Sequence, residues 1–204
     1  DAARAEAVEA AFVAFYEQLG RELAQLIKSK DAQQRQTGIA LTRVEFENLY
    51  GALGHALTNG LSFYGHFEPQ YELLLATQDH RGLNQLCGAV MAAQQLYTEQ
   101  QKAGEIGVDL YLVMARFARS FLEQKDPGRA ATIYQESLKT IAGLTNISAE
   151  QRGHFEAVTN HQLGMVAQEQ RQWAAAEGYY KQALAIQVEF NDRYRQASTL
   201  HQLG

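Results

Sequence analysis

The sequence has little of what several kinds of protein depend on. Cys87 is its only cysteine, which excludes an intrachain disulfide and a cysteine-based zinc motif and fits a reducing compartment. Only 2 prolines are present, and no stretch alternates apolar and polar residues with the period of two that is typical of strands. We therefore expect an all-α protein.

Long apolar runs are also missing. The longest candidate, Ala10 to Tyr16, is far shorter than the roughly 18 to 20 residues that cross a membrane. It follows the acidic residues Glu6 and Glu9, which the core of a signal peptide would not tolerate. We expect a cytoplasmic protein that does not bind membranes.

Basic clusters and catalytic motifs are absent as well. The formal net charge is -5 and the Lys and Arg residues are scattered, so no basic stripe could neutralise phosphates and we expect no nucleic-acid partner. The sequence lacks the P-loop pattern G-x-x-x-x-G-K-[ST], the pattern G-x-S-x-G and the pattern H-E-x-x-H. We therefore expect no enzyme, no cofactor and no metal site.

What the sequence does contain is helical periodicity. Apolar residues recur at steps of three and four from Val8 to Leu26, which predicts one amphipathic helix over about residues 2–28. Asp31 is a candidate N-cap for a second long helix that Asn59-Gly60 would end. Pro69 favours a helix that begins there, because proline suits the first helical turn. A further helix is expected from Asp79 to about residue 100.

The clearest feature is an internal repeat near the C-terminus. The segment Ala157-Val-Thr-Asn-His-Gln-Leu-Gly164 returns as Ala197-Ser-Thr-Leu-His-Gln-Leu-Gly204, a period of 40 residues (204 minus 164) with six of the eight positions identical. Repeats of this length are typical of stacked pairs of helices. Because the second copy stops in the middle of a unit and the chain does not start with Met, we expect the chain to be part of a longer protein.

Small residues are spaced regularly after this segment. Leu163-Gly164 is followed by Ala176, Tyr180 and Ala183, which lets two antiparallel helices approach closely while the tyrosine fills the gap beside the contact. This spacing resembles the tetratricopeptide repeat (TPR). The resemblance implies a right-handed α-solenoid of antiparallel helix pairs. The sequence departs from the usual pattern at Asn160, Ala167 and Val188, where Trp, Tyr and Pro are common.

An earlier unit has the same spacing. A shift of 46 residues places Ala130 and Tyr134 on Ala176 and Tyr180, which predicts a unit over about residues 108–142. We accordingly divide the chain into an N-terminal segment of two long helices, a degenerate TPR-like pair and about two and a half TPR units. These segments cover residues 1–60, 61–105 and 106–204.

A second resemblance lies in the N-terminal segment. Glu45-Phe-Glu-Asn-Leu49, followed by Ala52-Leu53 and Ala56-Leu57, is similar to the helical region between the ATPase module and the TPR array in bacterial signal-transduction ATPases of the NB-ARC or NACHT kind. This resemblance implies a role in signal transduction. It covers only about residues 31–60.

The TPR resemblance also implies a binding groove, because the first helix of each unit lines the concave wall of such a solenoid. The groove residues that it implies are Leu112, Ala115, Arg119, Leu122, Glu123, Val158, His161, Gln162, Met165, Gln168, Glu169, Ser198 and His201. Arg119 and His161 are among the residues that stand where some relatives carry the Lys and Asn that clamp a terminal carboxylate, so a clamp of that kind is not expected. The mixed composition suits an extended or helical peptide.

Two functions follow from these observations. We expect a protein-interaction or ligand-sensing region that binds a peptide or protein partner. The alternative is a structural scaffold that self-associates as a homodimer, because the last helix ends at Gly204 without its partner helix and leaves an apolar face uncovered.

Several single residues have a simpler interpretation than a chemical one. His161 and His201 occupy equivalent repeat positions, and no neighbouring ligands make them a metal site. Cys87 lies on an apolar helical face and is expected in the core. Glu45 and Glu47 are expected on a solvated face, because residues two apart point in different directions on a helix.

Overall fold

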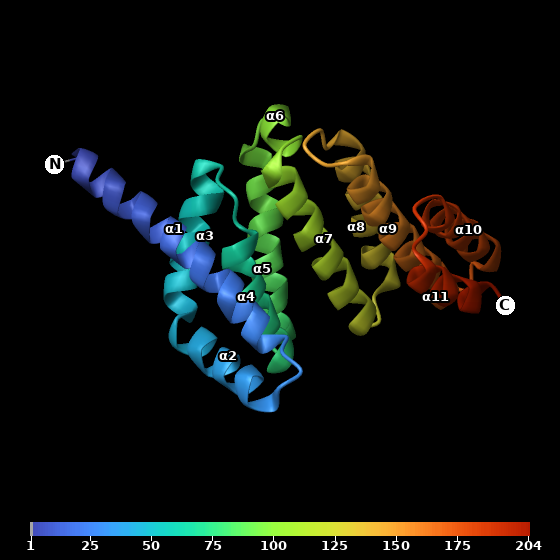
Figure 1. Ribbon diagram of the computed structural model, residues 1–204, viewed down its shortest axis with the longest axis horizontal. Coiled ribbons are helices and arrows are strands. Elements are labelled where there is room, and N and C mark those ends of the chain that lie inside the picture. The colour runs from blue at the N-terminus through green and yellow to red at the C-terminus, as the bar shows by residue number, and fades with distance from the viewer. Residues whose placement is uncertain (1) are drawn as a thin grey trace. The chain divides into compact units, whose positions relative to one another are not determined.

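The computed structural model describes residues 2–204, and within this range every regular element is helical (Figure 1). The expectation of an all-α protein is therefore confirmed. The chain divides into two compact units, one up to Thr98 and one over Glu99–Gly204, so the division does not coincide with the boundaries at 60/61 and 105/106. None of the described helices is both long and apolar enough to cross a membrane.

The first unit contains five α-helices and a short 3₁₀-helix. They are α1 (Ala2–Ile27), α2 (Ala32–Val44), α3 (Phe46–Asn59), α4 (Tyr64–Ala76), α5 (His80–Ala93) and η1 (Gln94–Leu96). The first helix agrees with the prediction, and Asp31 caps α2 as expected by accepting a hydrogen bond from the backbone N–H of Gln34 at 2.8 Å.

Three predicted boundaries in this unit were wrong. The single long helix expected up to residue 60 is two helices, α2 and α3, because the chain turns at Glu45, whose carboxylate accepts hydrogen bonds from Tyr16 and Asn48. Helix α4 begins at Tyr64, and Pro69 lies inside it. The helix that follows Asp79 ends at Ala93, well before residue 100.

Helices α1 and α4 approach each other closely at two glycines, Gly20 and Gly65. A Cβ atom on Gly20 would lie 2.1 Å from the carbonyl oxygen of Gly65. This oxygen is the one that the residue four positions later would bond in a regular helix, but that residue is Pro69, which has no N–H. The proline and the two glycines thus let the α4 backbone rest directly on α1.

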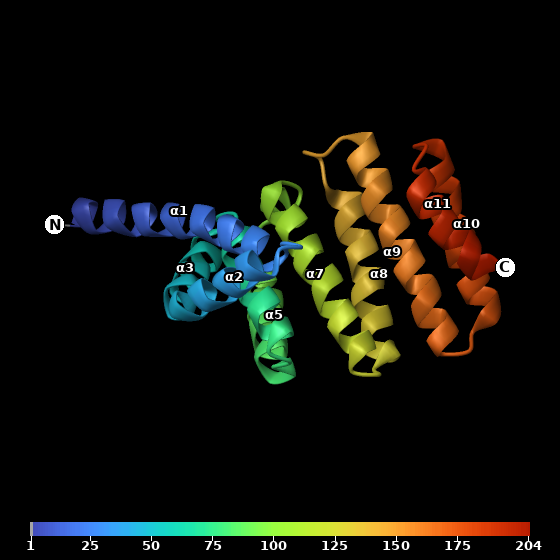
Figure 2. The ribbon, with the colours of Figure 1, turned by 60° about the horizontal axis from the view of Figure 1, so that its bottom comes forward.

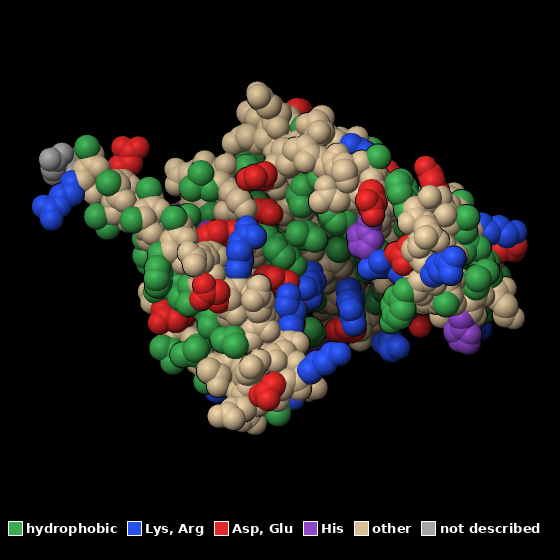
Figure 3. Space-filling view, in the orientation of Figure 1, with side chains coloured by type: hydrophobic (Ala, Val, Ile, Leu, Met, Phe, Trp, Pro, Cys, Tyr) green, Lys and Arg blue, Asp and Glu red, His purple; other side chains and the backbone are tan. Residues whose placement is uncertain are grey.

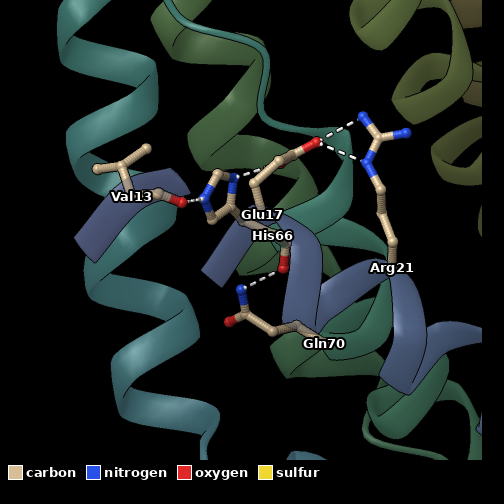
Figure 4. A network of polar contacts seen from close by, with 5 residues as sticks. All are labelled: Val13, Glu17, Arg21, His66 and Gln70. Carbon is tan, nitrogen blue, oxygen red and sulfur yellow. Dashed lines mark hydrogen bonds and ion pairs between the residues drawn. The ribbon is translucent and has the colours of Figure 1, made fainter. Parts of the chain in front are cut away.

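The close approach places a buried polar network between the two helices (Figure 4). The fully buried His66 has Nε2 at 2.9 Å from the Val13 carbonyl oxygen and Nδ1 at 2.8 Å from Glu17 Oε2. Because a carbonyl oxygen only accepts, Nε2 carries the hydrogen of that bond. Burial raises the pKa of the Glu17 carboxyl, whereas its contacts with His66 and Arg21 lower it. The lowering is larger than the rise, so the pKa lies below its ordinary value.

The amino-terminal end of α1 is exposed. Val8 and Phe15 are more than half exposed, and Figure 3 shows apolar side chains along this part of the helix. The predicted apolar stripe of α1 is therefore only partly buried: Leu23 lies in the core, and Phe12 and Leu19 are half-buried against it.

The second unit is a row of helices in sequence order (Figure 2). They are α6 (Glu99–Lys102), α7 (Glu105–Glu123), α8 (Pro127–Gly143), α9 (Ala149–Glu169), α10 (Trp173–Glu189) and α11 (Arg193–Leu203). Each helix from α7 to α11 packs against the next one. Asp126 caps α8, and Ser148 and Gln151 form a capping box at the start of α9.

Two core clusters of this unit repeat the same arrangement. In the first, Ala130 and Tyr134 of α8 pack with Leu163 of α9. In the second, Ala176 and Tyr180 of α10 pack with Leu203 of α11. The sequence repeat is therefore a repeat of packing, in which an alanine and a tyrosine of one helix pack with the leucine of the next.

Candidate functional site

Three hollows follow one another along α9. We call them the amino-end, middle and carboxyl-end hollows, with volumes of about 720, 180 and 450 Å³. The amino-end hollow is lined by Glu150, Gln151, Gly153, His154, Phe155, Ala157, Ile186, Gln187, Phe190, Asp192 and Arg195. The middle hollow is lined by Val158, His161, Gln162, Gln187, Tyr194, Arg195, Ser198 and Thr199. The carboxyl-end hollow is lined by Leu122, Met165, Gln168, Glu169, Arg171, Trp173 and Gln202.

The hollows belong together because of where their residues lie. Gln187 and Arg195 line both the amino-end and the middle hollow. The α9 residues of the middle and carboxyl-end hollows lie on successive turns of one helical face, and α11 contributes residues to all three hollows. We call the three hollows together the α9 trough.

The trough owes its depth to two glycines of α9. A Cβ atom on Gly153 would lie 2.3 Å from the ring of Phe190, and one on Gly164 would lie 2.5 Å from the ring of Tyr180. Both rings belong to the chain segment of α10 and its C-cap. The glycines therefore let α10 lie close to α9 as the floor on which α11 packs.

His161 joins α9 to α11 in the middle hollow. Its Nδ1 is hydrogen-bonded to Oγ1 of the fully buried Thr199 at 3.0 Å, and its ring centroid lies 5.3 Å from that of Tyr180. Burial lowers the pKa of His161, so the neutral imidazole is the favoured form. The histidine is thus partly structural. His201, its repeat equivalent, is exposed.

Polar pairs hold the two ends of the trough. At the carboxyl end, the hydroxyl of Tyr180 donates a hydrogen bond to Gln168 Oε1 at 2.6 Å, and burial raises the pKa of Tyr180 to about 12. At the amino end, the guanidinium of Arg195 donates to Asp192 Oδ2 at 2.6 Å, and the backbone N–H of Arg195 donates to Asp192 Oδ1 at 3.1 Å. These two hydrogen bonds lower the pKa of Asp192. Burial and the nearby Arg195 lower the pKa of His154, although Asp192 opposes this shift.

The structure brings together eight of the thirteen predicted groove residues. Val158, His161, Gln162 and Ser198 line the middle hollow, and Leu122, Met165, Gln168 and Glu169 line the carboxyl-end hollow. The other five, Leu112, Ala115, Arg119, Glu123 and His201, line none of the three hollows. Arg119 instead forms an exposed ion pair with Glu123, one helical turn further along α7, at 3.3 Å.

The amino-end hollow was not predicted. His154 could have been found, because it lies four residues before Val158 on the same helical face. Gln187 and Arg195 belong to other helices and had no signal in the sequence. Trp173 and Tyr194 were also missed as trough residues, although they are 64% and 88% exposed.

The structure also shows the surroundings of Cys87 and Glu45, the thiol and the carboxylate considered above for chemical roles. Cys87 is fully buried, as predicted, and burial raises the pKa of its thiol to about 12, so the reactive thiolate is strongly disfavoured. Glu45 is not simply solvated as expected, because it accepts hydrogen bonds from Tyr16 and Asn48 and its pKa is lowered by them. Among residues 2–204 no group of three or more His, Cys, Asp or Glu side chains could hold a metal ion.

The trough therefore combines aromatic surfaces with hydrogen-bonding side chains of both kinds. Carboxylates and amide oxygens accept, and the guanidinium groups of Arg171 and Arg195 donate. The amino-end hollow, at about 720 Å³ and with a mostly apolar lining, has the size and composition that are typical of ligand-binding pockets. No family model, no curated protein and no solved structure matches the chain.

Proposed function

We propose that the chain is a TPR-like α-solenoid that binds a peptide or protein segment in the α9 trough. The observation that carries this proposal is the trough itself, in which three hollows follow each other along one helix face beside exposed aromatic residues. The repeated alanine, tyrosine and leucine clusters support the solenoid part of the proposal.

The length of the trough favours an extended segment. Its lining residues on α9 run from Glu150 to Glu169, a helical length of roughly 28 Å at about 1.5 Å per residue. An extended peptide covers about 3.3 Å per residue. A segment of roughly eight or nine residues would therefore occupy all three hollows.

Trp173 is the residue that we expect to contribute most to such binding. It is exposed beside Leu122 and Met165 in the carboxyl-end hollow, and tryptophan is enriched among the residues that dominate binding energies. Peptides selected from a random phage-displayed library on the intact chain are expected to bind Trp173→Ala at least about tenfold more weakly. Fluorescence anisotropy of the labelled peptides measures this change.

Val188→Ala is the matched control for this experiment. Val188 is also an exposed apolar residue of α10, but it lines none of the three hollows. Its replacement should leave the affinities unchanged. If every selected peptide bound the wild type and Trp173→Ala equally well, the trough would not be the binding site.

The wider role that we propose is that of an interaction region within a cytoplasmic bacterial signalling protein. Its support is the sequence pattern Glu45-Phe-Glu-Asn-Leu49 and its continuation. Leu49, Leu53 and Leu57 of this pattern form the buried face of α3, so packing within the first unit also accounts for them. The proposal therefore depends on the pattern as a whole.

Self-association is a second candidate, and the exposed face of α11 favours it. Tyr194 is 88% exposed and Leu200 is 53% exposed on this helix, and exposed apolar side chains of this size offer contacts to a second copy of the chain. If α11 forms a homodimer, sedimentation velocity should show a dimer for the wild type and a monomer for Leu200→Lys. A monomeric wild type at about 100 times the concentration used for peptide binding would contradict this second function.

A further inference from the structure

Gln187 is a polar side chain in the wall between the amino-end and middle hollows. Only 2% of the residue is exposed, and its side-chain Oε1 has no hydrogen-bond partner among residues 2–204. Its backbone oxygen, in contrast, accepts from the Asp192 N–H at 2.8 Å and from Gln196 Nε2 at 2.9 Å. A buried acceptor without a donor is costly to a fold. Because Gln187 lines the 720 Å³ hollow, a ligand bound there is the candidate source of the donor.

The charges around the hollow restrict what this donor can be. Arg195 and Asp192 line the same hollow as an ion pair at 2.6 Å, and the other carboxylate of the lining, Glu150, is exposed. The two paired charges largely offset each other, so the hollow offers no buried unpaired carboxylate to a cation. An anion such as a carboxylate could pair with Arg195, but it has no hydrogen to donate to Gln187 Oε1. A neutral group that both donates and accepts satisfies both residues.

The walls of the hollow indicate what accompanies this group. Phe155 and Phe190 line it together with Ala157 and Ile186. Phe155 is held in place by Tyr111, whose ring centroid lies 4.4 Å away. Aromatic walls of this kind accommodate an apolar or aromatic body next to the polar group.

We propose that the amino-end hollow recognises a neutral amide, whose N–H is donated to Gln187 Oε1 and whose oxygen accepts from Arg195. This inference rests on the proposed function and names the chemical group that the trough reads at this end. The amide comes either from the peptide backbone or from an Asn or Gln side chain. The two sources share one chemistry and are separated by the probes below.

Three related derivatives of phenylalanine test the charge argument on the unaltered chain. At about pH 6, N-acetyl-phenylalaninamide is neutral, N-acetyl-phenylalanine is an anion, and phenylalaninamide is a cation. NMR titration of ¹⁵N-labelled protein should show that the neutral probe binds at least about tenfold more tightly than either charged probe. The shifted resonances should include the backbone amides of Phe155, Gln187 and Phe190. Equal affinity for the three probes would overturn the proposal.

Two further probes identify the source of the amide. N-acetyl-phenylalanine methyl ester retains only a backbone-type amide, whereas 3-phenylpropanamide carries only a primary amide like that of Asn or Gln. Tighter binding of the ester assigns the hollow to peptide backbone, and tighter binding of the propanamide assigns it to a side chain. Failure of both to bind contradicts the proposal.

Gln187→Met removes the acceptor and keeps the length of the side chain. The preference for the neutral probe should be lost, and the melting temperature should stay the same or rise, because no protein partner is left unpaired. Gln182→Met, at an exposed position of the same helix, should change neither property. A Gln187→Met variant that melts at a lower temperature and still prefers the neutral probe would show that the amide oxygen has a structural role.

The two proposals fail in different ways. If selected peptides lose affinity with Trp173→Ala while none of the neutral probes binds, the trough is a binding site and only the amide assignment is wrong. If the peptides are insensitive to Trp173→Ala, the proposed function itself is wrong, whatever the probes do.

Discussion

Replacing Gly20 with alanine is expected to lower the free energy of unfolding by roughly 3 kcal/mol, the upper end of what overpacking usually costs. In an exposed helix interior the same change normally stabilises by up to about 1 kcal/mol. Here the new Cβ would lie 2.1 Å from the carbonyl oxygen of Gly65 and 3.3 Å from Pro69 Cγ. A backbone oxygen cannot turn away as a flexible side chain can, so α1 and α4 must separate.

Separation of these helices would also weaken the network that they hold together. Glu17 and His66 come from the two sides of the contact, and their side chains meet at 2.8 Å. A buried charged group that loses its partner is strongly destabilising. The penalty of the added methyl group therefore extends beyond the clash itself.

Gly51→Ala is the matched control in the same unit. Gly51 lies inside α3, and a Cβ atom there would meet nothing within 4 Å. We expect this variant to be more stable than the wild type by roughly 0.5 to 1 kcal/mol. Urea unfolding followed by circular dichroism measures both changes. Equal stability of the two variants would show that α1 and α4 do not touch at Gly20.

Leu163→Ala is expected to cost roughly 2 to 5 kcal/mol in the second unit, as buried leucine truncations do. Leu163 is 2% exposed and lies in the cluster that joins α7, α8 and α9, beside Phe121 and Tyr134. The large aromatic rings around it cannot collapse fully into the space that the side chain leaves. Such a residual cavity adds to the lost burial.

The control for this variant is Leu200→Ala on α11. Leu200 is 53% exposed, so the same truncation there should change the free energy of unfolding by less than about 0.5 kcal/mol. The comparison is made from the urea midpoints of the two variants, provided that the free energy of unfolding falls with urea concentration at the same slope in both. If Leu163→Ala were as stable as Leu200→Ala, the repeat register that places Leu163 opposite Tyr134 would be incorrect.

Helix type and helix starts were predictable because the interactions that set them are local. Ser148 and Gln151 of the capping box are three residues apart, and Asp126 caps its helix across the same distance. The repeat spacing likewise placed Leu163, Ala176 and Tyr180 in the core, where they lie. Each of these inferences needed only a short window of sequence.

Boundaries that depend on distant residues were missed. The turn at Glu45 involves Tyr16, which lies 29 residues earlier in the chain. Helix α4 continues through Pro69, and Gly20 of α1 accommodates the Gly65 carbonyl that the proline leaves without an intrahelical donor. Nothing near Gly20 in the sequence indicates the backbone that rests on it.

The α9 trough likewise has a part that the sequence predicts and a part that only the packing of helices determines. The resemblance to the TPR pattern was sufficient to nominate Val158, His161 and Met165, which the structure places in the middle and carboxyl-end hollows. That resemblance could not show that Gln187 of α10 and Arg195 of α11 complete the hollow, or that Gln187 Oε1 is buried there without a protein partner. Those features arise from the packing of three helices, which brings together residues that no local pattern connects.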